Sequence, residues 1–385
     1  MIDRNLIFQI RQMQKKYPVL ALTGPRQSGK TTLLREVLED YNYVTLEDLD
    51  TRVFALEDPR GFLKLNDGKV IFDEVQRVPE LFSYIQSKVD REKKMGQIIL
   101  CGSQNFGLMK AINQSLAGRV AMFKLFPLDL KELSDAKMLG KDVESVILKG
   151  AYPAIYDRKI PTTTFYRNYI ETYIARDVPE VLNIHDLSQF KIFIFQLAGQ
   201  AGQVLNLNAI AKDTAISPPT AKAWMSLLES SYLCFRLQPY YRNFKKRTIK
   251  RPKLYFHDTG LLCHLLGIKT KADLLSNHQY GGIFENFIIS EIVKNNYHFD
   301  LGKEYWFWRD SNGKEIDLLA YQKNSYQLYE IKAGRTIKSD QFKNMNYFEE
   351  ISKSKVKKHL LYNGEETYVR SKTHIMNWKS LIHKK

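Results

Sequence analysis

Eight residues that follow a short apolar run constrain this chain more than any other segment. They read Gly24-Pro25-Arg26-Gln27-Ser28-Gly29-Lys30-Thr31 and fit the pattern GxxxxGK[ST] in full. The preceding residues, Val19–Thr23, have the composition of a buried strand, and a helical pattern begins at Thr31. A strand, a glycine loop and a helix in this order are typical of a phosphate-binding loop, because backbone N–H groups and the helix N-terminus face the phosphates.

A second strand supplies the carboxylates that such a loop needs. The run Val70–Asp73 is apolar until it ends in Asp73, and Glu74 follows directly. We expect Lys30 to reach the β- and γ-phosphates, and Thr31 and Asp73 to hold Mg²⁺, Asp73 through the ion's water shell. Glu74 would orient and activate the attacking water. Taken alone, the pair Asp73-Glu74 also fits a strand that runs into a solvated acidic turn.

The first 130 residues predict an α/β domain with a parallel sheet. Apolar runs alternate with helical patterns, and apolar strands without polar alternation indicate a sheet that is covered on both faces. The expected helices are 31–40, 80–90 and 106–116. The expected strands are Val19–Thr23, Tyr43–Leu46, Val70–Asp73, Ile98–Cys101 and Ala121–Leu125.

Polar residues after the next strands complete the candidate nucleotide site. Ser103 and Gln104 follow the strand Ile98–Cys101, where they would face the γ-phosphate and sense its loss. Arg119 follows Gly118 and fits an arginine finger that acts in cis or across a subunit boundary. An ordinary surface arginine explains Arg119 equally well.

Several segments together resemble a known family. They are GPRQSGKTTLL, VIFDEVQ, ILCGSQN, SLAGRV, LFPLDLKEL, YIETYIARDVPE and PKLYFHDTGLL, and they span nearly the whole chain. The chain resembles the prokaryotic AAA-type ATPases that carry a C-terminal domain of unknown function. The resemblance implies that ATP and Mg²⁺ are ligands and that ATP binds at residues 24–32, a range that extends the motif by Thr32. It also implies Walker B roles for Asp73 and Glu74 and a sensor at Ser103 or Gln104.

Residues 207–229 predict two helices joined by a short turn. Ser217 suits an N-cap, Pro218 suits the first helical position, and Ala209, Ile210, Leu227 and Leu228 are expected to be buried. A strand at 232–237 would begin the wing of a winged helix. The second helix offers only Lys222 and small polar residues for reading DNA, so a packing role and groove binding both remain open.

The adjoining segment Arg236–Lys253 contains eight basic residues and no acidic one in 18 positions. Tyr240, Tyr241 and Phe244 lie among these basic residues. Basic side chains neutralise phosphates and aromatic rings stack on bases, so the segment predicts contact with DNA or another nucleic acid. The alternative is a solvated linker that happens to be basic.

The C-terminal region contains a carboxylate–lysine constellation. Glu285 lies in a helical pattern, Asp317 in one expected strand, and Glu330 and Lys332 on the same face of the next strand. This order resembles the PD-(D/E)xK nuclease-like fold, although Ile316 stands where a proline sometimes precedes the aspartate. The resemblance implies that Asp317 and Glu330 bind a second Mg²⁺ or Mn²⁺, that Lys332 orients the attacking water, and that Glu285 assists. A hairpin with solvent-facing charges is the alternative.

Charge, cysteine content and hydropathy bear on the partners and the compartment of the chain, but they identify no single partner. The formal net charge is +16, of which residues 1–128 contribute +4 and the remainder +12. The three cysteines form no CxxC pair, which favours a reducing, cytoplasmic compartment over a disulfide framework. The longest uncharged stretch, 192–211, is too polar to span a membrane. A homo-oligomer is compatible with Arg119 acting across a subunit boundary.

The pattern along the chain predicts four parts. They are a P-loop AAA-type ATPase domain (1–130), a helical connector (131–185), a winged helix-turn-helix (186–250) and an α+β domain of restriction-endonuclease type (251–385). The favoured function is ATP hydrolysis coupled to a nucleic-acid-contacting half with a candidate nuclease site. The alternatives are a nucleotide-dependent regulatory switch whose nuclease-like domain is inert, and an oligomeric ATPase that remodels a protein.

Overall fold

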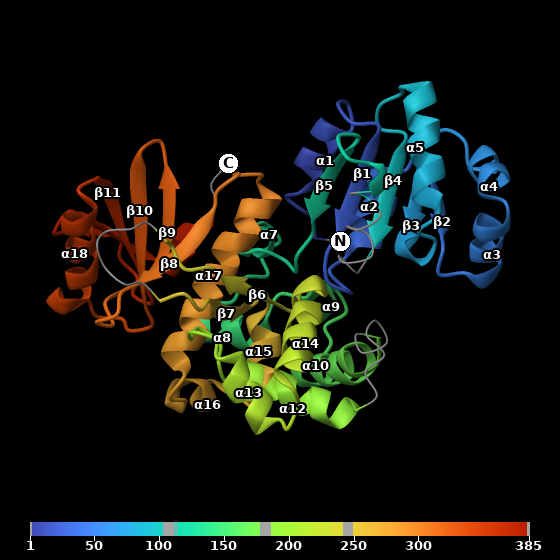
Figure 1. The fold of residues 1–385 in the computed structure, drawn as a ribbon. Helices are drawn as coiled ribbons and strands as arrows, with labels where there is room; N and C mark the ends of the chain where they lie inside the picture. Colours follow the sequence, from blue (N-terminus) through green and yellow to red (C-terminus); the bar gives the residue numbers. More distant parts are fainter. Residues whose placement is uncertain (1, 103–111, 113, 178–185, 242–248, 383–385) are drawn as a thin grey trace. The chain divides into compact units, whose positions relative to one another are not determined.

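Five parallel strands form the sheet of the N-terminal part. The structure is a computed structural model that describes residues 2–102, 112, 114–177, 186–241 and 249–382. The strand order is β2-β3-β4-β1-β5, and every neighbouring pair is parallel (Figure 1). The strands are β1 (Val19–Thr23), β2 (Asn42–Thr45), β3 (Val70–Asp73), β4 (Ile98–Gly102) and β5 (Val120–Lys124).

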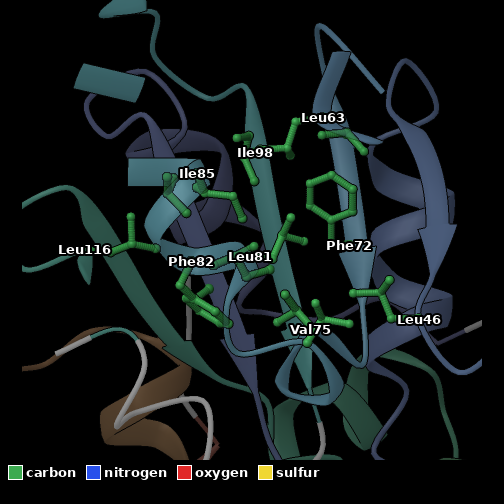
Figure 2. Packing of buried hydrophobic residues seen from close by; sticks show 14 of the residues in the cluster. Leu46, Leu63, Phe72, Val75, Leu81, Phe82, Ile85, Ile98 and Leu116 are labelled. Atoms are coloured by element: carbon green, nitrogen blue, oxygen red, sulfur yellow. The ribbon is translucent and has the colours of Figure 1, made fainter. Parts of the chain in front are cut away.

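Helices cover both faces of this sheet, as the apolar runs predict. Successive residues of a strand point to opposite faces, so Phe72 joins one core while Ile71 joins the other. The first core includes side chains of α4 (Pro59–Leu65) and α5 (Leu81–Glu92) (Figure 2). The second includes side chains of α1 (Ile7–Met13) and α2 (Lys30–Val37). The predicted parallel α/β fold of this part is confirmed.

Three helices of this part are absent from the sequence-based prediction. They are α1, which precedes β1, and α3 (Leu49–Glu57) and α4, which lie between β2 and β3. In α3 only Ala55 is buried, while Leu49, Val53 and Leu56 are exposed, so no apolar stripe marks the helix in the sequence. Residues 106–111 and 113 of the predicted helix at 106–116 lie outside the described residues, and residues 112, 114 and 115 are helical.

The middle of the chain is helical. Its short helices are α7 (Leu130–Asp135), α8 (Val143–Lys149), α9 (Pro153–Asp157) and α10 (Thr162–Tyr169), and a π-helical segment (Ile170–Asp177) follows. Buried aromatic rings pack together here, among them Tyr152, Phe165 and Tyr169, with ring centroids 4.9–5.9 Å apart. These contacts, rather than long helices, supply the apolar core of the segment.

A helical pair and a small sheet follow. The elements are α12 (Leu187–Ala198), α13 (Leu207–Asp213), α14 (Pro218–Ser230) and the antiparallel strands β6 (Cys234–Leu237) and β7 (Lys253–Phe256). Ser217 caps α14 by accepting a hydrogen bond from the N–H of Thr220, as predicted. Ile210, Leu227 and Leu228 are buried as expected, but Ala209 is exposed, because the buried face of α13 is carried by Ile210 and Ala211.

The C-terminal part contains a six-stranded mixed sheet in the order β12-β13-β11-β10-β9-β8. Figure 1 labels four of these strands, β8 to β11. Helix α18 (Lys343–Ser352) packs on β9 and β11. Its residues Met345 and Phe348 share one core with Leu328 and Leu360 of the sheet. The helices that precede the sheet are α15 (Thr259–Leu265), α16 (Lys271–Ser276) and α17 (Tyr280–His298). The strands are β8 (Tyr305–Arg309), β9 (Glu315–Gln322), β10 (Ser325–Lys332), β11 (Lys355–Tyr362), β12 (Tyr368–Arg370) and β13 (Thr373–Asn377).

The chain divides into two compact units. One contains residues 1–128 together with Ser230–Tyr232 and Tyr297–Asp300, and the other contains the rest. Within the first unit the Tyr232 hydroxyl donates to Oγ1 of Thr23 at 2.7 Å, and the Phe126 N–H donates to Nε2 of His298 at 3.3 Å. Two short segments from far along the chain therefore complete the unit that contains the P-loop. The division of the second unit into three predicted domains remains a proposal.

Two further observations concern the cysteines and the helices. Cys101, Cys234 and Cys263 are all buried and free of disulfides. Among the described residues, no helix has the length and apolar character that crossing a membrane requires.

Candidate functional site

The P-loop has a backbone shape that only glycine allows at its first position. Gly24 has a φ of 150°, and a Cβ placed there would lie 2.1 Å from the carbonyl oxygen of Leu125. Gly29, directly before α2, has a φ of 93°, in the left-handed region. The glycines of the motif are therefore required by the path of the loop at the end of β1.

Lys30 lies folded against its own loop. Its Nζ donates to the carbonyl oxygens of Gly24 and Pro25, both at 2.9 Å, and the side chain is buried. Burial lowers the pKa of Lys30, although Cys101, Glu74 and Asp73 oppose that change. The buried Ser28 hydroxyl has no hydrogen-bond partner among the described residues. A buried cation and a buried unsatisfied hydroxyl in one loop suit an anionic ligand.

Asp73 connects the loop to the end of β3. Its Oδ2 accepts from the Thr31 hydroxyl at 2.8 Å and from the Tyr43 hydroxyl at 2.5 Å. Its Oδ1 accepts from the N–H of Glu74 at 3.0 Å. The structure thus brings together the predicted Mg²⁺ ligands Thr31 and Asp73, and hard oxygen ligands of this kind suit Mg²⁺.

Glu74 occupies a special backbone conformation beside this pair. Its φ is 55°, and its Oε2 accepts from the Gln76 side chain at 2.5 Å. Burial raises the pKa of Glu74, the Asp73 carboxylate raises it further, and the Lys30 ammonium opposes the rise. A carboxylate with a raised pKa next to the loop is a suitable general base.

The hairpin of β9 and β10 brings three of the four predicted C-terminal residues into contact. Leu318 pairs with Tyr329 in an antiparallel register, so Asp317 and Glu330 are neighbours on one face. Oδ2 of Asp317 accepts from the N–H of Ile331 at 2.8 Å. Nζ of Lys332 lies 2.6 Å from Oε1 of Glu330 and 3.8 Å from Oδ2 of Asp317.

Glu285 reaches the same place from α17. Carboxylate oxygens of Glu285, Glu315 and Asp317 all lie within 4.8 Å of one another. We call these three residues, together with Glu330, the carboxylate cluster. Asp317 and Glu330 are buried, and Glu285 and Glu315 are half-buried. Carboxylates that cluster in such a place are costly unless cations or protons compensate their charge.

Desolvation has a large effect on the carboxylate cluster. Burial, reinforced by the charge of Asp317, raises the pKa of Glu285 to about 7 and that of Glu330 to about 8. The ammonium of Lys332 is desolvated too, but the charges of Asp317 and Glu330 outweigh that effect and raise its pKa. Shifted pKa values of several neighbouring groups are typical of functional sites, although structural ion-pair networks show them as well.

Two residues of β7 contact the carboxylate cluster. Nζ of Lys253 lies 2.8 Å from Oε1 of Glu285 and also pairs with Oε1 of Glu315. The Tyr255 hydroxyl donates to Oε1 of Glu285 at 2.6 Å. Lys253 is only 3% exposed.

Family models match three consecutive parts of the chain. Residues 16–134 match an AAA domain, residues 140–272 match a domain of unknown function (DUF8612), and residues 280–381 match another (DUF4143). Residues 16–134 form an ATPase domain of the P-loop AAA type. No helix-turn-helix or nuclease model is among these matches, so both assignments belong to the proposals below.

Similar proteins come from several prokaryotes. An uncharacterized protein of Mycobacterium tuberculosis, Rv2008c, is 28% identical over 337 residues, which are 86% of this chain and 74% of that protein. An uncharacterized protein of Haemophilus influenzae is 24% identical over 353 residues, 83% of this chain and 84% of that protein. The Walker-type ATPase PABY2304 of Pyrococcus abyssi is 15% identical with a TM-score of 0.45, over 69% of this chain and 96% of that structure.

Arg119 lies at the wrong edge of the ATPase domain for a role in cis. Parallel pairing places Val120 beside Val19 at the amino ends of β5 and β1, whereas the P-loop follows the carboxyl end of β1. Five residues of strand separate these edges by roughly 15 Å. Arg119 instead forms two hydrogen bonds with Asp90, of 2.5 and 3.0 Å. A role across a subunit boundary stays a prediction.

The structure describes three more of the predicted nucleotide-binding residues. Nη2 of Arg26 lies 3.7 Å from Oε1 of Glu47, Gln27 has a φ of 62°, and Thr32 is exposed. Ser103 and Gln104 lie outside the described residues. Two residues of this site carry no signal in the sequence. They are Tyr43, which orients Asp73, and Arg4, which donates to the carbonyl oxygens of Ser28 and Phe126, both at 2.6 Å.

The basic segment 236–253 is less available than its composition indicates. Arg236 forms an ion pair with Glu229 at 2.6 Å, and Lys253 is buried in the carboxylate cluster. Tyr240 packs against Trp306 and Tyr326, which makes it part of a core rather than a platform for bases. Lys250 and Arg251 are exposed, and residues 242–248 lie outside the described residues.

Proposed function

We propose that this chain binds ATP with Mg²⁺ and hydrolyses it. The contact between Thr31 and Asp73, 2.8 Å long, carries the proposal, because it joins the loop hydroxyl and the strand-end carboxylate that together would hold Mg²⁺. The buried Lys30 ammonium and the unpaired Ser28 hydroxyl add groups that suit a polyphosphate.

The residues of the loop and of β3 suggest how the reaction proceeds. Bound Mg²⁺ would neutralise charge on the β- and γ-phosphates. Lys30 would leave its carbonyl partners and bind phosphate oxygens, which compensates its buried charge. Glu74 would accept a proton from the attacking water, whose oxygen bonds to the γ-phosphorus as the bond to the β–γ bridging oxygen breaks. Tyr43 would keep Asp73 oriented toward the metal.

Two substitutions separate binding from hydrolysis. Lys30→Ala should weaken ATP binding by at least about tenfold, the value of one lost charged hydrogen bond. Glu74→Gln should retain ATP while turnover falls by about 10²–10⁴-fold. Calorimetry and phosphate release measure the two quantities, and Lys64→Ala, an exposed lysine of α4, is the matched control. Hydrolysis by Lys30→Ala at the parent rate would exclude the P-loop as the site.

A second candidate activity is metal-dependent cleavage of a phosphodiester by the C-terminal part. The observation that favours it is the meeting of Glu285, Glu315 and Asp317 within 4.8 Å, beside Glu330 and Lys332. Carboxylate oxygens of this kind suit Mg²⁺ or Mn²⁺, which would lower the pKa of a bound water. Lys332 would orient that water, whose oxygen bonds to phosphorus while one ester oxygen leaves and takes up a proton.

The element order from α12 to β7 supports nucleic-acid contact by the same half. Residues 201–204 form isolated bridges to β7, so two helices are followed and flanked by a small sheet, as in a winged helix. Lys222 on α14 and Lys250 and Arg251 before β7 are exposed and available to phosphates. The alternative function, a nucleotide-dependent switch with an inert nuclease-like domain, is favoured by the pairing of Lys253 with two cluster carboxylates.

A cleavage assay distinguishes these alternatives. Single- and double-stranded DNA and RNA are incubated with the full chain and Mg²⁺ or Mn²⁺, with and without ATP. If the chain is a nuclease, Lys332→Ala should reduce cleavage by about 10²–10³-fold and leave ATP turnover intact. Lys357→Ala, an exposed lysine of the same sheet, is the control. Cleavage that Lys332→Ala leaves unchanged would reject this site.

A further inference from the structure

Lys253 provides the carboxylate cluster with a cation from within the chain. It is buried, lies within hydrogen-bond distance of Glu285, pairs with Glu315, and its Nζ is 5.7 Å from the ring centre of Phe307. Burial alone would lower the pKa of Lys253, but Tyr255 and the surrounding carboxylates raise it well above its usual range. The side chain is therefore a charged ammonium held among carboxylates.

The ammonium pairs with the residues that a metal ion would need. Glu285 and Glu315 are two of the three residues whose oxygens come within 4.8 Å of one another. Oε1 of Glu285 already accepts hydrogen bonds from both Lys253 and Tyr255. A divalent cation bound to the same oxygens would face the lysine at a few ångströms, where two positive charges repel strongly.

One carboxylate oxygen of the cluster is buried without a hydrogen-bond partner among the described residues. This atom is Oε2 of Glu330, a residue that is 4% exposed. Its other oxygen is engaged by Lys332. A buried carboxylate oxygen without a partner is costly, and coordination to a cation would satisfy it.

We propose that Lys253 is an intramolecular occupant of the carboxylate cluster, and that a divalent cation binds there only when this lysine withdraws. The inference rests on the metal site proposed above for the C-terminal part. It assigns that site a closed state, in which the lysine compensates Glu285 and Glu315, and an open state, in which Mg²⁺ or Mn²⁺ does so.

Backbone hydrogen bonds connect the strand of Lys253 to the segment that precedes α13. Leu205 N–H donates to the carbonyl of Pro252 at 2.8 Å, Leu254 N–H to that of Gln203 at 3.1 Å, and Gly202 N–H to that of Leu254 at 2.8 Å. Strand β7 is thus bonded to residues 202–205, directly before α13, and to β6. Displacement of the α13–α14 segment would draw Lys253 away from carboxylates that α17 and β9 carry.

Metal binding by the full chain tests this competition. An Asp73→Asn background removes the carboxylate from the metal ligands of the nucleotide site, and Mn²⁺ binding is measured by electron paramagnetic resonance without nucleotide. Lys253→Met should bind Mn²⁺ at least about tenfold more tightly than its parent, because the competing charge is gone. Lys253→Arg keeps the charge, and Lys250→Met changes an exposed neighbour, so neither should tighten binding. Equal or weaker binding by Lys253→Met, or no Mn²⁺ binding by either protein, would overturn the proposal.

A measurement on the parent chain does not depend on how Lys253→Met folds. Acetic anhydride labels exposed amines, and mass spectrometry reports the labelling of each lysine. Saturating Mn²⁺ should increase labelling of Lys253 severalfold while labelling of Lys250 stays constant. Labelling of Lys253 that is unchanged by Mn²⁺ would contradict a withdrawal of this side chain.

The outcomes also separate this inference from the proposed nuclease. Tight Mn²⁺ binding by Lys253→Met without cleavage of any nucleic acid would keep the competition and reject the nuclease. Cleavage by the parent chain with no change in Mn²⁺ affinity on substitution of Lys253 would keep the nuclease and reject the competition.

Discussion

A single buried carboxylate, Asp258, joins two segments of the second unit. Its Oδ2 accepts from the N–H of Ala151 at 2.7 Å, and its Oδ1 accepts from the Tyr166 hydroxyl at 2.6 Å and the N–H of Leu261 at 2.8 Å. The side chain is 2% exposed. Two of the three partners are backbone N–H groups, which can only donate, and each of them faces a different carboxylate oxygen.

Asp258→Asn should therefore destabilise the protein although the shape of the side chain is preserved. In either orientation, the amide NH₂ faces at least one donor, which costs about 1.5–3 kcal/mol of unfolding free energy. Urea unfolding followed by circular dichroism measures the change. Asp157→Asn, on an exposed site at the end of α9, is the control and should shift the midpoint little. Equal midpoints for the two variants would show that the three bonds contribute nothing.

At the scale of elements, three neighbouring strands align a stack of rings. The register pairs Tyr329 of β10 with His359 of β11, and His359 with His374 of β13. The ring centroids are 4.8 Å and 5.6 Å apart. Burial, assisted by the charges of His374, Lys357 and Lys303, lowers the pKa of His359 to about 4. The strand pairing thus keeps His359 neutral at physiological pH.

The lowered pKa predicts acid sensitivity of the C-terminal sheet. Between about pH 6.5 and pH 4 the unfolded chain binds a proton that the folded chain does not, so folding stability falls as the pH falls through this range. His359→Gln should reduce the difference between urea midpoints measured at pH 7 and pH 5. His278→Gln changes an exposed histidine and should retain the full difference. The same pH dependence in both variants would exclude His359 as its source.

At the scale of the whole molecule, the ATPase unit depends on distant parts of the chain. Tyr232 is buried in this unit, donates to Thr23 directly before the P-loop, and packs edge-on against Phe126 at 5.7 Å. His298 accepts from the backbone of Phe126. The end of α14 and the end of α17 thus belong to the unit that would bind nucleotide.

Substitution of Tyr232 should weaken the ATPase unit. Tyr232→Ala removes a buried ring and should cost about 3–5 kcal/mol, whereas Tyr232→Phe removes only the hydrogen bond and should cost about 1 kcal/mol. Thermal unfolding of the full chain with and without ATP measures both. Tyr241→Ala, an exposed tyrosine nearby in sequence, is the matched control. Tyr232→Ala that unfolds with its parent would mean that the ring is not part of this unit.

The sequence predicted those features that local patterns determine. Strands β1 and β3 have the predicted bounds, because their apolar runs are interrupted by glycine or carboxylates at the sheet edge. Glu315 was missed although strand alternation places it on the face of Asp317, so the signal was present. Strand alternation could not predict that Lys253 belongs to this site, because its partner Glu285 lies 32 residues away in the sequence. The run of eight basic residues that contains Lys253 also resembles a solvated surface.

The interleaving of the two units also affects how the protein is made. Residues 1–128 leave the ribosome before Ser230–Tyr232 and Tyr297–Asp300, which are needed to complete their unit. Since nascent domains usually fold in the order of synthesis, the P-loop unit would wait, with the surface around Phe126 uncovered, until these later segments have emerged. A nucleotide or a chaperone that protects this surface during translation would then determine how much of the protein reaches its native state.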